Sequence, residues 1–214
     1  MTLQETALLA AKAAGAHIDV AEVIAREEEA LQAQAKELRT ALKPDQKYLR
    51  GLFSGGTLCY ESQVIWRDML KEPVLSNAPL RHENQLADSL HSVKHTCVDL
   101  GEEEFTVGRP HPMIDNDLRI RRLLQEARDP EVAAIMLDVV IGYGAHPDPA
   151  SELGPAIRQA KQLLDRQLIV VASVTGTEQD PQRLSAQVAA LQAAGVIVCD
   201  SNAAAAKLVA ALVG

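Results

Sequence analysis

Glycine and hydroxyl residues stand together at Ser54–Thr57, which reads Ser-Gly-Gly-Thr. Glycines allow a tight turn and a close backbone approach to a ligand, and free N–H groups at a helix start bind anions. The stretch matches neither the Walker A loop nor GxGxxG. We predict that Ser54, Gly55, Gly56 and Thr57 bind an anion such as phosphate, a carboxylate or carbamoyl phosphate. The alternative is a glycine-rich turn whose threonine only caps the helix.

A second stretch, Gly101–Asp115, is too long for an ordinary loop between a strand and a helix. It holds an arginine, Arg109, and a histidine, His111, that lies between Pro110 and Pro112. An arginine can bind a carboxylate or phosphate through two hydrogen bonds, and a histidine can transfer protons near neutral pH. We therefore predict catalytic roles for Arg109 and His111. The alternative is a surface loop that the prolines shape and in which His111 is solvated.

Two further stretches follow apolar runs, begin with glycine and carry polar residues. The first, Gly142–Asp148, contains His146, which we expect to face the same cleft as His111 and, like it, to act in catalysis through proton transfer or polar contacts. The second is Gly176–Gln182. The residues of these stretches predicted to contact an anion are Gly142, Gly144, Gly176 and Thr177.

One carboxylate, Asp138, lies within the apolar run that precedes Gly142. An unpaired carboxylate there would be costly, so Asp138 is expected to be paired or catalytic. Asp138, Asp148, His146 and Glu102–Glu104 could hold a divalent metal, but no diagnostic spacing supports one. No metal site is predicted.

Strands and helices alternate after Pro44, which predicts right-handed crossovers and a parallel sheet. The fold class expected is α/β, with a flavodoxin-like doubly wound sheet of five strands in the order 2-1-3-4-5. The expected strands are Tyr48–Phe53, His95–Leu100, Val132–Ile141, Leu168–Val174 and Val196–Cys199. The expected helices are Thr57–Leu70, Asp117–Ala127, Ser151–Asp165, Pro181–Ala194 and Asn202–Val213.

Residues 1–43 form a helical N-terminal extension to the domain predicted for residues 44–214. Strong helix formers dominate this extension, and Asp19 is the expected N-cap of a helix from Val20 to about Leu42. Asp180 is expected to cap a later helix in the same way, with Pro181 as its first residue. In a sheet of the predicted order, ligands bind where the strand order reverses, beyond the carboxyl ends of the strands. The four chemically loaded stretches are expected at that edge.

The composition excludes several classes of protein. The net charge is −8, and the aromatic residues are one Trp, three Tyr and two Phe. A basic face for nucleic acid and a base-stacking platform are therefore not expected. No apolar run reaches the length of about 18 residues that suggests a membrane span, so a cytoplasmic protein is expected. The three separated cysteines are expected to be small buried side chains: Cys59, Cys97 and Cys199.

Several of these segments resemble known families. Ser54–Glu61, SGGTLCYE, and Leu191–Val198 resemble parts of the CoA-ligase domain of the succinyl-CoA synthetase α-subunit. Four segments together look more closely like the C-terminal half of FdrA-type proteins, described as acyl-CoA synthetase-like, over about residues 44–212. These are SGGTLCYE, DLGEEEFTVGRPHPMID, DVVIGYGAHPDPA and TGTEQDPQ.

The resemblance implies a subunit of oxamate carbamoyltransferase, which phosphorolyses oxalurate to oxamate and carbamoyl phosphate together with other subunits. It implies phosphate or carbamoyl phosphate as ligand, and CoA only with a partner domain. The stretch Thr177–Leu184, where CoA ligases carry their catalytic histidine, contains none, so a phosphohistidine mechanism cannot be transferred. The alternatives are a non-catalytic assembly domain, or a CoA ligase whose partner chain supplies the missing parts. A multisubunit oligomer is expected.

Overall fold

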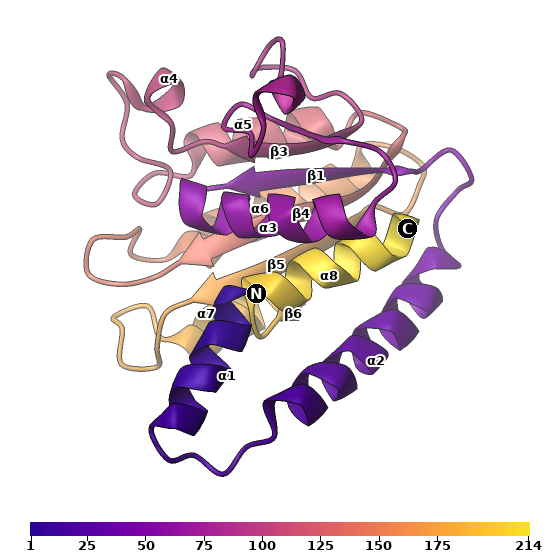
Figure 1. Cartoon of the computed structure of the whole chain (residues 1–214). Helices are drawn as coiled ribbons and strands as arrows, with labels where there is room; N and C mark the ends of the chain where they lie inside the picture. Colours follow the sequence, from indigo (N-terminus) through magenta and orange to yellow (C-terminus); the bar gives the residue numbers. More distant parts are fainter.

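A single parallel sheet with helices on both faces forms the body of the molecule in the computed structural model, which describes residues 1–214 (Figure 1). The strand order is β2-β3-β1-β4-β5-β6, and every neighbouring pair is parallel. The strands are β1 Tyr48–Phe53, β2 Val74–Ser76, β3 His95–Asp99, β4 Val132–Val140, β5 Ile169–Thr175 and β6 Ile197–Cys199.

The α/β class and the parallel sheet are confirmed, but the predicted strand count and order need correction. The sheet has six strands, and β2 extends it at the edge beyond β3. This strand has only three residues, so it leaves no alternating pattern in the sequence. The other five strands start within one residue of their predicted positions.

Helices α3 and α8 cover one face of the sheet, and α5, α6 and α7 cover the other (Figure 1). The helices that follow the strands are α3 Gly56–Met69, α4 Glu103–Thr106, α5 Asp117–Glu126, α6 Pro149–Gln162, α7 Leu184–Ala193 and α8 Asn202–Val213. The short 3-10 helix η1, His82–Asn84, lies between β2 and β3. Each face has its own apolar core, one around Trp66 and Phe53 and the other around Leu52 and Leu123.

The N-terminal extension forms two helices, α1 Leu3–Ala13 and α2 Val20–Arg39. The predicted cap is confirmed, because the Asp19 carboxylate accepts the backbone N–H of Ala21 at 3.0 Å. Leu31 and Ala35 are buried where α2 lies along α8, whereas α1 buries no residue. Figure 1 shows α2 outside α8, as a further layer on that face.

The cysteines are all free thiols. Cys59 and Cys97 are fully buried, as predicted, and Cys199 is half-buried. Burial of Cys199 raises the pKa of its thiol to about 12. None of the helices is both long enough and apolar enough to cross a lipid bilayer.

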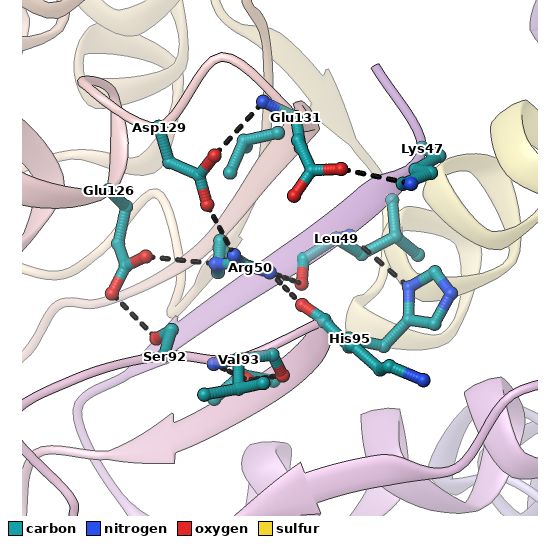
Figure 2. A network of polar contacts seen from close by, with 12 residues as sticks. Lys47, Leu49, Arg50, Ser92, Val93, His95, Glu126, Asp129 and Glu131 are labelled. Carbon is teal, nitrogen blue, oxygen red and sulfur yellow. Dashed lines mark hydrogen bonds and ion pairs between the residues drawn. The ribbon is translucent and has the colours of Figure 1, made fainter. Parts of the chain in front are cut away.

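A buried arginine, Arg50, lies at the centre of a network of ion pairs at the amino ends of the strands (Figure 2). Its guanidinium pairs with Glu126 at 2.9 Å and with Asp129 at 2.8 Å, and it donates to the carbonyl oxygen of Lys94. Arg122 also pairs with Glu126. The network therefore connects β1 with the end of α5 and with the segments that lead into β3 and β4.

A buried histidine, His95, stands beside this network (Figure 2). Its Nδ1 accepts the backbone N–H of Leu49 at 3.2 Å, and its ring contacts Tyr48 edge-on. Burial lowers the pKa of His95 from 6.5 to about 4; the nearby cations Arg50 and Lys94 add to that shift, and Glu72 opposes it. The ring is neutral at pH 7.

Replacing the buried cation should destabilise the protein strongly. In Arg50→Leu, Asp129 loses its ion-pair partner and Glu126 keeps only Arg122, so we expect the free energy of unfolding to fall by about 3–5 kcal/mol in urea denaturation. Arg26→Leu is the control, because Arg26 forms an exposed pair with Glu22 and should change the stability by less than about 1 kcal/mol. Equal losses in both variants would contradict the role given to the buried network.

Acidification should weaken the fold through His95. Its pKa is about 4 in the folded chain and near 6.5 in the unfolded chain, so the unfolded state binds the proton first. The stability that neutral His95 contributes is complete above about pH 6.5 and is lost as the pH falls toward 4. We expect the unfolding free energies of wild type and His95→Gln to converge between pH 7 and pH 4.5. Parallel pH profiles of the two proteins would show that His95 does not titrate on unfolding.

Candidate functional site

The four stretches predicted to hold the functional residues lie at the carboxyl edge of the sheet. Ser54–Thr57 follows β1, Gly101–Asp115 follows β3, Gly142–Asp148 follows β4, and Gly176–Gln182 follows β5. These four strands are parallel neighbours, so their carboxyl ends face the same side. After β1 the chain places β2 and β3 on one side of it and β4, β5 and β6 on the other, so the strand order reverses beside β1 at this edge.

The start of α3 has unpaired backbone donors. Gly55 is the N-cap residue and provides no side-chain cap, and the first backbone bond of the helix runs from Cys59 N–H to Gly55 O at 3.4 Å. The amides of Gly56, Thr57 and Leu58 precede that bond, so they have no partner within the helix. A Cβ built on Gly55 would meet nothing within 4 Å. The helix start is therefore open to a ligand.

Ser54 is committed within the chain instead. Its backbone N–H donates to Asp138 Oδ1 at 2.8 Å, and its hydroxyl donates to Asp138 Oδ2. Arg119 of α5 donates to the same carboxylate at 3.1 Å and to the carbonyl oxygen of Asp138. Ser54, Asp138 and Arg119 are all buried, and burial lowers the pKa of Arg119. Asp138 is thus paired, and its pairing fixes the end of β1 against β4.

Asp99, a carboxylate that no sequence pattern marks as functional, is the last residue of β3 and lies beside the start of α3. It is 3% exposed, and Phe53 of β1 is its neighbour in the sheet. Oδ1 accepts the N–H of Gly101 at 2.8 Å. Burial, first, and the negative charges of Glu102 and Asp138 raise its pKa, which the Gly101 hydrogen bond and His111 partly offset.

His111 also lies near the end of β3, and Gly101 stands between its ring and the end of β1. A Cβ on Gly101 would meet His111 Nε2 at 2.9 Å, Asp99 Oδ1 at 3.1 Å and the carbonyl oxygen of Ser54 at 2.7 Å. The ring Nδ1 accepts the N–H of Met113 at 3.2 Å, so in the neutral ring the proton is on Nε2, the nitrogen that approaches Gly101. His111 is therefore brought to the start of α3, as the sequence predicts.

His146 lies in a loop that contacts the loop of His111, but its ring is engaged elsewhere. Its backbone N–H donates to Met113 O at 2.7 Å, which ties the two loops together. Its Nε2 lies 3.2 Å from a carboxylate oxygen of Glu152 in α6, and its Nδ1 accepts the N–H of Asp148 at 3.1 Å. Both ring nitrogens thus have partners within the chain. His146 supports the loop that carries His111.

The loops after β4 and β5 are also tied to each other. Gln182 accepts the N–H of Gly142 at 3.2 Å and donates to its carbonyl oxygen at 2.9 Å. Asp180 accepts the N–H of Thr177 at 2.6 Å and its hydroxyl at 3.0 Å. Asp180 is therefore not a helix cap, and α7 begins at Leu184 instead of Pro181, which corrects that prediction. Gly144 has open space around it, and a Cβ on Gly176 would strike Ile141.

Arg109 lies at a separate hollow of about 250 Å³, with Pro110, Asp115, Asp117 and Arg121 among its lining residues. Another hollow of about 480 Å³ lies between α1 and α3 and reaches Thr57. No group of three or more histidine, cysteine or acidic side chains converges as metal ligands would. The structure thus brings Gly56 and His111 to Asp99, with Gly55 and Thr57 next to Gly56, whereas the side chain of Arg109 forms no hydrogen bond or ion pair with this group.

Comparison with known proteins places this arrangement in a family. Residues 52–212 match the family model described as CoA-ligase. The chain is also 45% identical over 169 residues to an "Uncharacterized protein YahF" of Escherichia coli (strain K12). That alignment covers 78% of this chain and 33% of the relative, so this chain spans about a third of the relative's length.

Adding one methyl group at Gly101 should disturb the group of residues around Asp99. In Gly101→Ala, the new Cβ would lie 2.7 Å from a backbone oxygen, so the loop has to move, and we expect a loss of about 1–3 kcal/mol in unfolding free energy. Gly55→Ala is the control, because its Cβ meets open space and should cost less than about 1 kcal/mol. If the two alanine variants melt alike, the close approach at Gly101 is not what holds this loop.

Proposed function

Because the chain belongs to the CoA-ligase family and its α3 begins with free amides, we propose that it binds a small phosphate-bearing or carboxylate-bearing molecule at the carboxyl edge of the sheet. The uncapped start of α3 carries this proposal. A helix start offers N–H donors and the positive end of the helix dipole, which together favour an anion. Thr57 adds an exposed hydroxyl, and His111 adds an Nε2–H donor.

The finer proposal is that the chain acts as a subunit or part of an oxamate carbamoyltransferase-type enzyme of the FdrA type, with phosphate or carbamoyl phosphate as ligand. Carbamoyl transfer needs charge stabilisation and orientation more than a covalent nucleophile. The site supplies donors for such charge, with the carboxylate of Asp99 and the imidazole ring of His111 beside them. CoA would require a partner domain. Further subunits are part of this proposal.

A second candidate function is that of a non-catalytic assembly domain. The observation that favours it is the turn after β5, where CoA ligases carry a histidine. Here Thr177 is bound to Asp180 through both of its donors, and the stretch has no histidine. A closed turn of this kind holds the fold together without reaching a ligand.

Phosphate or carbamoyl phosphate should raise the melting temperature of the chain. In Thr57→Glu we expect the shift to disappear, because a carboxylate in the first turn is compatible with the helix dipole and competes with an anion for the amides. Thr57→Gln has nearly the same size without the charge and is the matched control. Thermal melts with each anion at constant ionic strength measure the effect.

The variant Arg109→Ala, measured in the same thermal melts, tests whether Arg109 contributes to anion binding. Loss of the anion-induced shift would place Arg109 in the site, as the sequence predicts, whereas a retained shift would leave binding to α3 and His111. If neither anion shifts the melting of the wild-type chain, the binding proposal fails and the assembly function is favoured.

A further inference from the structure

The carboxylate of Asp99 has one oxygen that the chain leaves unused. The residue is held on three sides: its N–H donates to Asn77 Oδ1 at 2.9 Å, its carbonyl oxygen accepts Asn77 Nδ2 at 2.9 Å, and Oδ1 accepts Gly101 N–H. Oδ2 accepts no hydrogen bond from the chain. Although the residue as a whole is only 3% exposed, Oδ2 is not among the fully enclosed unpaired atoms of the chain, so it stays accessible to a ligand that can donate to it.

Oδ2 is directed at the start of α3. A Cβ on Gly56 would lie 3.1 Å from it, so only a glycine lets the carboxylate come this close to the first helical residue without a shift. The oxygen does not cap the helix, since no bond joins it to the amides of Gly56, Thr57 or Leu58. The space in front of α3 is therefore bordered by several donors and by one fixed acceptor.

No cation neutralises this acceptor. Arg119, the buried arginine of the same edge, pairs with Asp138, and no lysine or arginine forms an ion pair with Asp99. The charged or titratable groups that face Asp99 are Glu102, Asp138 and His111. Of the remaining elements, α3 presents the ring of Tyr60 beyond Gly56, and the segment after β2 presents Asn77.

An anion at the start of α3 thus meets a carboxylate. An oxyanion without a proton would place two negative oxygens together with no hydrogen between them, which is unfavourable. An oxyanion that keeps a proton would donate it in a short, charge-assisted hydrogen bond to Oδ2. Phosphate keeps a proton at pH 7 and sulfate does not. A ligand with a hydroxyl or N–H group next to its phosphate would fit in the same way, with the phosphate at the amides of α3 and the hydroxyl or N–H donating to Oδ2.

We infer that Asp99 determines the specificity of this site, by accepting a hydrogen bond from the bound anion and so selecting anions that carry a proton or another donor. The inference rests on the proposed anion binding at α3. Asp99 then contacts the ligand directly and is not only a structural residue at the end of β3.

Four inorganic anions test this on the wild-type chain. Phosphate and arsenate keep a proton at pH 7, whereas sulfate and selenate have none. Within each of these two pairs the second anion is larger, so the four anions separate the effect of the proton from the effect of size. Calorimetric titration at pH 7 and fixed ionic strength should give phosphate and arsenate affinities at least about tenfold above those of sulfate and selenate, because a hydrogen bond to a charged group is commonly worth a factor of that order.

Asp99→Asn is the decisive variant. Its amide can keep the bond to Gly101 through the oxygen and present an NH₂ donor where Oδ2 was, so the preference should vanish or reverse in favour of sulfate. Glu103→Gln removes the same charge from an exposed position of the same loop and should keep the wild-type order of affinities.

The outcomes separate the inference from the proposal it rests on. If all four anions bind the wild-type chain equally well, or if Asp99→Asn keeps the preference for phosphate, the inference is wrong and the anion site stands. If none of the four binds either protein, the proposed binding fails and the inference fails with it. Should Asp99→Asn not fold, the ranking of the four anions on the wild-type chain decides alone.

Discussion

A buried charge has to be compensated inside the chain, and this constraint clamps α5 to the sheet at both of its ends. At the amino edge, Arg50 of β1 reaches Glu126 in the last turn of α5. At the carboxyl edge, Arg119 in the first turn of α5 reaches Asp138 of β4. All four side chains are nearly inaccessible to solvent. Removing one partner leaves an uncompensated charge, so these pairs fix position even where they add little net stability.

The clamp at the carboxyl edge also shapes the functional site. Asp138 takes both donors of Ser54, and Ser54 stands between β1 and the first turn of α3. The turn is therefore held by hydrogen bonds within the chain, and the first amides of α3 beside it have no partner in the helix. A ligand that binds to a fixed site loses less free energy to ordering of the protein. The N-terminal helices take no part in this clamp, since they contact the other face through α8.

Local patterns were sufficient to predict most of the fold. The apolar run of β4 and the change to helix formers after Gly55 identify their elements from neighbouring residues alone. The edge strand β2 escaped because three residues form no pattern. The start of α7 was misplaced because Asp180 has two possible uses, and the bonds to Thr177 prevailed over a cap.

The candidate site was predictable only in part, because its key contacts join distant residues. The glycines at the start of α3 and His111 stand out by type and by flanking prolines. Asp99 does not, since its meaning comes from its place beside Phe53 in the sheet and from the space left by Gly56. Arg50 is similar: its partners Glu126 and Asp129 are 76 and 79 residues away in the sequence.

Two glycines at the carboxyl edge of the sheet, Gly56 and Gly101, lie against the carboxylate of Asp99. The sequence suggested that Gly56 lets a ligand approach the backbone. In the structure, Gly56 lies against Oδ2 of Asp99 and Gly101 lies against Oδ1, each with a Cβ position 3.1 Å away. One carboxylate thus lies close against two glycines that are far apart in the chain, although at Gly101 the carbonyl oxygen of Ser54 is closer still. Because Gly56 has no side chain, Oδ2 of Asp99 can lie at the start of α3. An anion bound there would contact both the N–H donors of the helix and the negative charge of Asp99. The anion site is then restricted to anions that tolerate this carboxylate.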